Sequence, residues 1–165
     1  MARRSDAAAG TPATVALTRA GIPFTAHAYE HDPRAAAYGL EAAEKLGVDP
    51  DRVFKTLLAN VDGALVVGIV PVAMQLDLKA LAHALGGKRA EMADPAVAER
   101  KTGYVVGGIS PIGQKAALPT VLDESAILAE TVFVSGGRRG LDLELAPDDL
   151  LAVTSGRYAP IARAR

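Results

Sequence analysis

The sequence predicts a single domain of the α/β or α+β class with a mixed β-sheet. Two observations predict it: helix-like and strand-like segments alternate along the chain, and two of the strand-like segments form an adjacent hairpin. The 165 residues are enough for one domain, and 50% of them are hydrophobic, which is enough to fill a core. We find no linker long enough to separate two domains, and we expect residues 1–10 to be a flexible tail.

Helices are predicted where a capping residue and a proline precede an apolar face. Thr11 and Pro12 begin the first helix in this way, and Gly21 ends it. Asp94 and Pro95 begin another helix with the same pattern. The predicted helices are residues 12–20, 39–46, 76–85, 95–100 and 147–153.

The clearest strand signal is a hairpin over residues 53–72. Two runs rich in β-branched residues, 53–61 and 64–72, flank the pair Asp62-Gly63, which favours a tight turn with a positive φ at the glycine. Further strands are predicted at 22–29, 90–92, 104–106, 121–122, 131–135 and 141–145.

Charge and composition exclude several classes of protein. Eighteen Lys and Arg against nineteen Asp and Glu give a net charge of −1, so general cationic attraction cannot hold a nucleic acid. Such a partner must be held by local patches, for which Lys88, Arg89, Arg138 and Arg139 are candidates, or be delivered by another protein. The longest apolar run, residues 64–74, reaches about half of a membrane span, so we expect a soluble, cytoplasmic protein that does not enter membranes.

Nucleophiles and metal ligands give little signal. The chain has no cysteine, and no serine lies in a Gly-x-Ser-x-Gly motif, which argues against thiol chemistry and conventional serine hydrolases. His27 and His31 are four residues apart, but in a strand and turn, where that spacing need not converge on a metal. We therefore expect neither a metal nor a cofactor.

Lys55 is a cation in an otherwise apolar row. In a strand with a two-residue period, it shares a face with Val53, Leu57, Ala59 and Val61. An ammonium in such a row is costly unless an anion or a polar cavity meets it. Alternatively, the strand lies near a sheet edge, where the lysine stem is buried and its amine reaches water.

A glycine-rich loop, residues 107–113 (GGISPIG), interrupts regular structure. Adjacent glycines leave backbone N–H groups uncovered, and such groups can hold a phosphate or a developing oxyanion. The segment differs from a phosphate-binding P-loop, because Gln114 separates Gly113 from Lys115 and Ala116 replaces the metal-binding hydroxyl. An ordinary Gly/Pro turn is the alternative.

A second glycine-rich turn lies within residues 135–142 (SGGRRGLD), between two predicted strands. Alternation places Asp142 and Glu144 on the polar face of the second strand. The turn arginines, Arg138 and Arg139, are either exposed charges or contacts for phosphate.

Six blocks of the sequence together resemble the YbaK/EbsC family, most closely its Cys-tRNA(Pro) deacylase branch, which is related to the editing domain of prolyl-tRNA synthetases. The similarity spans residues 11–163, nearly the whole chain. The blocks are 29–33 (YEHDP), 53–58 (VFKTLL), 75–79 (QLDLK), 91–95 (EMADP), 102–113 (TGYVVGGISPIG) and 134–145 (VSGGRRGLDLEL).

The resemblance implies a fold and an activity. The implied fold, over residues 11–165, is a mixed, partly barrel-like sheet surrounded by helices. The implied activity is hydrolysis of the ester that joins a wrong amino acid to a tRNA 3′ end, usually cysteine on the proline tRNA. In the family the substrate's own thiol is thought to attack its carbonyl, which suits a chain with no evident nucleophile.

The resemblance also implies partners and leaves alternatives. The substrate would be Cys-tRNA(Pro), presented in a transient complex with prolyl-tRNA synthetase. One alternative is a non-catalytic module that binds a nucleotide or a tRNA end. Another is a deacylase for a different amino acid, such as alanine.

Family residues carry over where the motifs match. Lys55, in V-[FY]-K-T-L, matches the essential lysine, and Gly107 and Pro111 match a G-x-x-x-P loop whose amides approach the aminoacyl group. Tyr38 stands where the family commonly has phenylalanine. The expected catalytic residues are Lys55, Gly107, Tyr29 and Asp142, and the expected substrate-binding residues are Thr56, Gly108, Ser110, Pro111, Ser135, Tyr38, Gly136 and Gly137.

Overall fold

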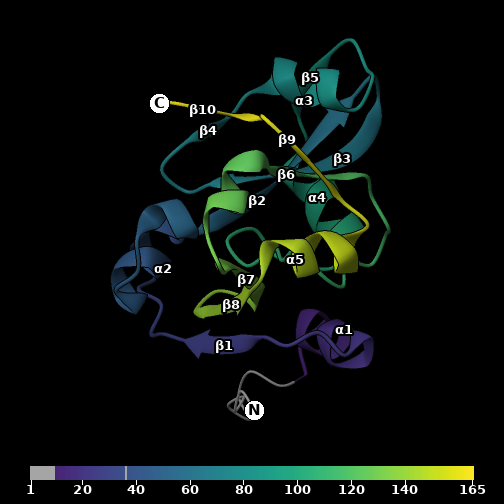
Figure 1. Ribbon diagram of the computed structural model, residues 1–165. Coiled ribbons are helices and arrows are strands. Elements are labelled where there is room, and N and C mark those ends of the chain that lie inside the picture. The colour runs from purple at the N-terminus through teal and green to yellow at the C-terminus, as the bar shows by residue number, and fades with distance from the viewer. Residues whose placement is uncertain (1–9, 36) are drawn as a thin grey trace.

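Helices lie around β-sheets in the computed structural model of the chain (Figure 1), which describes residues 10–35 and 37–165. The expected tail, residues 1–10, lies outside the described residues except for Gly10. The described helices are α1 (Pro12–Ala20), α2 (Tyr38–Leu46), α3 (Leu78–Ala84), α4 (Pro95–Thr102) and α5 (Pro147–Thr154), with short 3-10 helices η1 (Pro50–Arg52) and η2 (Glu124–Leu128). None of them has both the length and the apolar character that a membrane span requires.

The described strands form one large mixed sheet and two small antiparallel ones. The large sheet has the order β5-β2-β3-β6-β9, in which β2 is antiparallel to β3 and β5, whereas β6 is parallel to β3 and β9. The small sheets are β1-β8-β7 and β10-β4, and the described strands do not close into a barrel. The strands are β1 (Thr25–Ala28), β2 (Phe54–Val61), β3 (Ala64–Pro71), β4 (Gln75–Leu76), β5 (Ala90–Met92), β6 (Thr120–Asp123), β7 (Val132–Arg138), β8 (Leu141–Leu145), β9 (Arg157–Ala159) and β10 (Ala162–Arg163).

The expected α/β class and mixed sheet are confirmed, and so are the strongest local signals. The Thr11 hydroxyl accepts a hydrogen bond from the Thr14 N–H at 3.2 Å, and Gly21 ends α1 in the left-handed region. Strands β2 and β3 pair through Asp62 and Gly63, both with positive φ, as a type I′ turn requires.

Two sequence predictions differ from the structure. The strand predicted at 104–106 is wrong: the Gly108 N–H donates to the Val105 carbonyl at 2.8 Å, which closes a turn there. The helix predicted from residue 76 begins at Leu78, because the Asp77 carboxylate caps it and Gln75 and Leu76 pair with β10. The short strands β4, β9 and β10 carry too little periodicity to be predicted.

The large sheet is covered by apolar side chains on both faces. One core contains Ile69 and Leu122 together with Leu17 of α1 and Leu143 of β8, all fully buried. Another core lies on the opposite face, where Leu81 of α3 belongs to the same buried cluster as residues of β2, β3 and β6. This packing holds β2 firmly, and β2 supplies one wall of the site described next.

Candidate active site

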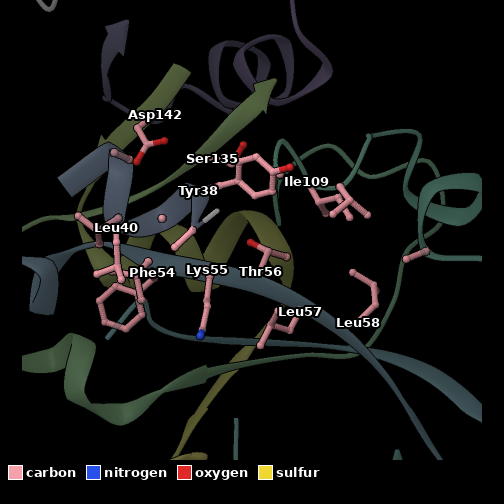
Figure 2. Close-up of a pocket in the computed structure, with 18 of the residues that line it drawn as sticks. Tyr38, Leu40, Phe54, Lys55, Thr56, Leu57, Leu58, Ile109, Ser135 and Asp142 are labelled. Carbon is pink, nitrogen blue, oxygen red and sulfur yellow. The ribbon is translucent and has the colours of Figure 1, made fainter. Parts of the chain in front are cut away.

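A cavity of about 400 Å³ lies between α2, the start of β2, the loop after α4 and the β7–β8 hairpin (Figure 2). Strand β5 pairs with residues 59–61 of β2, and the Ala93 N–H donates to the Leu58 carbonyl, so the edge of β2 before Leu58 is open to the cavity. Successive residues of both β2 faces therefore line it. The volume is typical of a small-molecule site and exceeds what one amino-acid side chain needs.

Lys55 lines this cavity and is partly buried. Burial lowers the pKa of Lys55, and the positive charge of Arg165 lowers it further. Among the described residues, no carboxylate forms an ion pair with its amine. Lys55 and Arg165, which also lines the cavity, thus make a cationic region in which no described carboxylate pairs with the lysine.

The lysine amine and the neighbouring threonine hydroxyl point in opposite directions. Figure 2 shows Thr56 directed toward the side that holds Tyr38 and Ser135, and the Lys55 amine directed away from it. The Thr56 hydroxyl is buried, and no described residue bonds to it. The cavity therefore has a cationic region on one side of β2 and a group of hydroxyls on the other.

Asp142 of β8 places an acidic group among those hydroxyls. It lies opposite Ser135 in the β7–β8 pairing, and both side chains reach the cavity. Only 5% of Asp142 is exposed, and burial raises the pKa of its carboxyl to about 7. Within residues 10–35 and 37–165, nothing donates a hydrogen bond to this carboxylate.

Tyr29 completes the acidic region. Burial, followed by the negative charge of Asp142, raises the pKa of the Tyr29 phenol to about 12. Its hydroxyl therefore stays protonated at neutral pH and can donate a hydrogen bond, but it cannot act as a base there.

The glycine-rich loop brings a free backbone donor to the cavity at Gly107. Gly107 lines the cavity with a φ of +89°. Its N–H has no acceptor among the described residues, whereas the Gly108 N–H is used in the turn with Val105. Of the two adjacent glycines, only Gly107 is therefore placed to donate to a ligand.

The remaining predicted site residues divide into two groups. Tyr38, Thr56 and Ser135 line the cavity, but Gly108, Ser110, Pro111, Gly136 and Gly137 do not. Ser110 is fully buried, and its hydroxyl accepts from the Ile112 N–H at 3.2 Å, so it stabilises the loop. The Gly137 N–H donates to the Ser135 hydroxyl at 3.2 Å, which holds that side chain.

The histidines and the other predicted cations are not among the residues that line the cavity. His27 contacts Glu144 and His31 contacts Glu41, each at 2.8 Å, so the pair does not converge. The described residues contain no group of three or more His, Cys, Asp or Glu side chains suited to a metal. Lys88 and Arg89 bond through their backbone N–H groups to Asp62, and neither lines the cavity.

Sequence reasoning missed the place of Arg165 in the site and the contact that Arg139 makes. Arg165 follows the last strand, and its guanidinium donates to the Val72 carbonyl at 3.4 Å. Nothing in the local sequence indicates that a residue so far along the chain approaches Lys55. Arg139 is bonded to the Val106 carbonyl, a contact between two loops that no local pattern predicts.

Comparisons with known proteins agree with this geometry. A protein of Enterococcus faecalis, assigned as the Cys-tRNA(Pro)/Cys-tRNA(Cys) deacylase EbsC, is 46% identical over 121 residues, which are 72% of this chain and 73% of that protein. The proline–tRNA ligase of Maridesulfovibrio salexigens is 34% identical over 100 residues, which are 61% of this chain but 17% of the ligase. A solved structure described as a trans-editing enzyme for prolyl tRNA synthetase has a TM-score of 0.83 at 25% identity and covers 97% of this chain and 99% of that one.

The family described as the aminoacyl-tRNA editing domain matches residues 32–153. This match covers most of the chain and includes Lys55, the glycine-rich loop and Asp142. The resemblance carried by the six sequence blocks is confirmed: the chain belongs to the aminoacyl-tRNA editing domain family.

Proposed function

We propose that this protein is a trans-editing deacylase that removes cysteine from Cys-tRNA(Pro), with the substrate's own thiol as the attacking group. One observation carries the proposal: a single cavity contains a buried carboxylate, a backbone N–H and a lysine amine, and none of the three is paired with a described residue. The aminoacyl end of a tRNA presents an ammonium, an ester carbonyl and a phosphodiester. The cavity offers a complementary group for each.

Asp142 is the partner for the substrate ammonium. An α-amino group with a pKa of about 7.7–8.0 is largely charged at neutral pH. A buried carboxylate stays ionised at a low cost only when a cation pairs with it. The substrate would supply that cation and keep Asp142 ionised when it binds.

The Gly107 N–H is the donor for the oxyanion that forms as the ester carbonyl is attacked. A preorganised donor of this kind contributes about 3–4 kcal/mol to transition-state stabilisation. Because this N–H has no acceptor in the described part of the chain, the oxyanion would not compete with an existing bond there. Thr56, Ser135 and Tyr29 remain as hydroxyl partners for the aminoacyl group.

Lys55 binds the phosphate of the terminal nucleotide or polarises the ester. Its amine points away from the Asp142 side of β2, which favours the phosphate role. Arg165 adds a second positive charge to that region. An anion there would relieve the repulsion between the two cations.

The chemical step then needs no protein nucleophile. The cysteine sulfur attacks its own ester carbonyl carbon, the bond from that carbon to the ribose oxygen breaks, and the thiol proton ends on the ribose oxygen. The products are free tRNA and a strained cyclic thioester, which water opens to cysteine. Orienting an intramolecular attack of this kind contributes about 7–11 kcal/mol.

The decisive experiment compares amino acids on one tRNA. The protein is incubated with proline tRNA charged with cysteine, serine, alanine or proline, and loss of each ester is followed over time. We expect rapid loss of cysteine alone, because serine has nearly the same size but lacks the thiol. Equal loss of alanine would assign another deacylase activity, and loss of none would favour a non-catalytic binding module.

Replacing Lys55 by alanine is expected to lower kcat/KM for Cys-tRNA(Pro) by about 30-fold, since a charge-assisted contact of about 2 kcal/mol is lost. Lys55→Arg should recover part of the loss. Lys88→Ala is the matched control, because that lysine is exposed and does not line the cavity. A folded Lys55→Ala protein with wild-type rates would remove Lys55 from the site.

Delivery by prolyl-tRNA synthetase is part of the proposal. With a net charge of −1, the protein has few cations for tRNA phosphates, and Lys55 and Arg165 are the two that line the cavity. We expect weak tRNA binding. The logarithm of the binding constant should fall by about 0.7 per unit of log salt concentration for each phosphate of the single-stranded tRNA end that the protein contacts. Titration of fluorescent tRNA tests this, and prolyl-tRNA synthetase should lower the half-saturating concentration. Tight binding by the isolated protein at physiological salt, with discrimination between tRNAs, would contradict it.

A further inference from the structure

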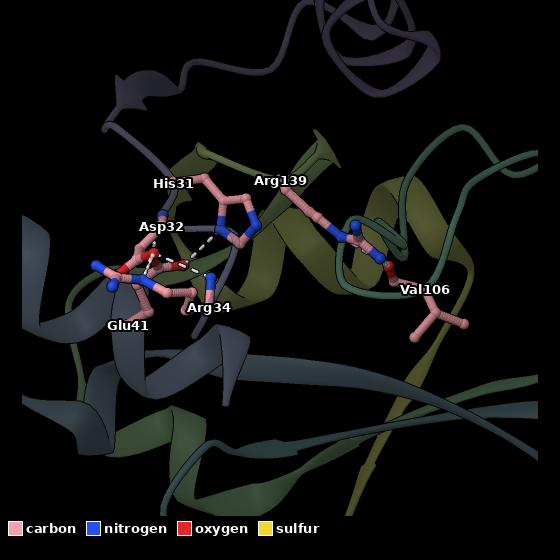
Figure 3. A network of polar contacts seen from close by, with 6 residues as sticks. All are labelled: His31, Asp32, Arg34, Glu41, Val106 and Arg139. Atoms are coloured by element: carbon pink, nitrogen blue, oxygen red, sulfur yellow. Dashed lines mark hydrogen bonds and ion pairs between the residues drawn. The ribbon is translucent and has the colours of Figure 1, made fainter. Parts of the chain in front are cut away.

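Arg139 joins the β7–β8 turn to the glycine-rich loop. Its Nε and Nη2 atoms both donate to the Val106 carbonyl oxygen, at 3.0 and 2.6 Å. Figure 3 shows the side chain reaching across to Val106 from the hairpin. The guanidinium carbon also lies 4.8 Å from the centre of the Tyr38 ring, a cation–π distance.

The carbonyl that Arg139 binds belongs to the same peptide unit as the free N–H of Gly107. The Val105–Gly108 turn is closed by its own hydrogen bond, with a positive φ at Gly107 but not at Val106, which is the type II geometry. In a planar trans peptide, C=O and N–H point in opposite directions. Holding the Val106 carbonyl on one side therefore directs the Gly107 N–H to the other.

The hydrogen bond that closes the Val105–Gly108 turn is compatible with either orientation of its central peptide. A type I turn differs mainly by a flip of the central peptide, and glycine adopts both conformations at little cost. Two charge-assisted bonds to one carbonyl oppose that flip. They also polarise the peptide, which strengthens its N–H as a donor.

The residues around Arg139 hold it in place. Tyr38 lies under the guanidinium, and its ring is 5.8 Å from that of His31. His31 is in turn bonded to the buried Glu41 at 2.8 Å (Figure 3), which ties this wall to α2. A methyl group on Gly107 would lie 2.7 Å from Arg139 Nε, so the loop and the arginine are packed closely.

We infer that Arg139 is a positioning residue, which fixes the Val106–Gly107 peptide so that its N–H is held ready for the oxyanion. The inference rests on the proposed function, in which that N–H acts on the ester. It differs from the sequence hypothesis that Arg139 contacts tRNA phosphate.

Single-turnover kinetics with saturating protein separate the two roles. For Arg139→Ala we expect the rate constant at saturation to fall by about 30-fold, with less than a twofold change in half-saturating concentration. Arg139→Lys, which keeps one donor but not the planar fork, should be intermediate. Arg138→Ala is the matched control, since it removes the neighbouring exposed charge, and its rate constant should be unchanged.

The opposite pattern would overturn the inference. Arg139 would be assigned to a phosphate instead if Arg139→Ala raised the half-saturating tRNA concentration and left the rate constant unchanged. The salt dependence of tRNA binding, as the slope of log binding constant against log salt concentration, should then be smaller by about 1. Should Arg139→Ala fail to fold, the same comparison is made with Arg139→Lys.

A second measurement does not depend on activity. In ¹⁵N NMR spectra, the amide resonances of Gly107 and Gly108 should shift and broaden in Arg139→Ala, as the peptide begins to exchange between orientations. The Gly107 resonance should stay unchanged in Arg138→Ala, because the atoms close to Gly107 belong to Arg139 and Tyr38. Unchanged resonances in Arg139→Ala would refute the positioning role, whereas a wild-type protein that cleaves no aminoacyl-tRNA would refute only the proposed function.

Discussion

Replacing Asp142 by asparagine is expected to slow deacylation by about 100-fold. It should also stabilise the folded protein relative to wild type, and this stabilisation should be larger at pH 8 than at pH 4. The loss of activity reflects a lost ion pair with the substrate ammonium, worth about 3 kcal/mol in a buried site. Stability should rise while activity falls, because the ionised Asp142 carboxylate is buried without a partner when no substrate is bound and so destabilises the folded protein. Both effects come from the same unpaired group.

The direction of the pH dependence follows from the pKa. Burial raises the pKa of Asp142 from 3.8 to about 7, so the folded state binds the proton more tightly than the unfolded state does. The associated stability is present below about pH 4 and is lost as the pH rises through 7, by up to about 4 kcal/mol. Urea unfolding of both proteins from pH 4 to 8 measures this difference.

Glu144→Gln is the matched control, two residues along the same strand face. Burial alone would raise the pKa of Glu144, but hydrogen bonds from Thr131 and His27 and the charge of Arg52 hold it below its usual value. Removing this charge should therefore destabilise the protein above about pH 4.5, the opposite sign to Asp142→Asn. If Asp142→Asn lost stability at pH 8 relative to pH 4, as Glu144→Gln should, an unpaired Asp142 would be excluded.

The activity should report the same group. Wild-type kcat/KM is expected to fall as the pH drops below about 7, because protonated Asp142 no longer attracts an ammonium. Asp142→Asn should lose the part of this decline that Asp142 causes and keep only the part that comes from ionisation of the substrate thiol. A decline of equal size in the variant would mean that another group titrates.

Replacing Gly107 by alanine is expected to reduce the deacylation rate constant by about 1,000-fold while the half-saturating tRNA concentration changes little. An added methyl would meet Arg139 Nε at 2.7 Å and the Tyr38 ring at 3.0 Å. The φ of +89° is also unfavourable for any residue with a Cβ. We expect this strain to rotate the peptide, so that its N–H leaves the position from which it donates.

Gly63→Ala separates backbone strain from loss of the donor. Gly63 has a nearly equal φ of +87°, and a Cβ there would meet no atom within 4 Å. It should cost about 1 kcal/mol of stability with an unchanged deacylation rate. Thermal melting and single-turnover assays on both variants test this, and full activity in Gly107→Ala would exclude its N–H from catalysis.

Much of the fold could be predicted from local sequence. The cap and proline at Thr11-Pro12 and the Asp62-Gly63 turn determine their structures within a few residues, so periodicity and turn chemistry identify them. Residues 104–106 have strand-forming side chains, yet they enter a turn because Gly107 and Gly108 follow. Strands β4, β9 and β10 exist only because distant partners pair with them, which no local signal reports.

The candidate site divides in the same way. Motif resemblance selected Lys55, Gly107 and Asp142, and all three line one cavity. The alternation of residues correctly placed Asp142 and Glu144 on the same face of the strand. Only the surrounding chain determines that Asp142 is buried and that Glu144 pairs with His27 and Arg52. The burial of a side chain depends on which distant segments pack over its strand, whereas the two-residue alternation indicates only the face of the strand on which the side chain lies.

By itself, then, the sequence determined which segments become helices and hairpins, which blocks place the chain in its family, and which residue types are available for chemistry. Tertiary structure alone decided that Gly107 rather than Gly108 has a free N–H, that Arg165 lies near Lys55, and that Arg139 holds the Val106 carbonyl. The physical reason is that hydrogen-bond satisfaction and burial are properties of contacts between distant segments. A residue's own neighbours in the chain do not contain that information.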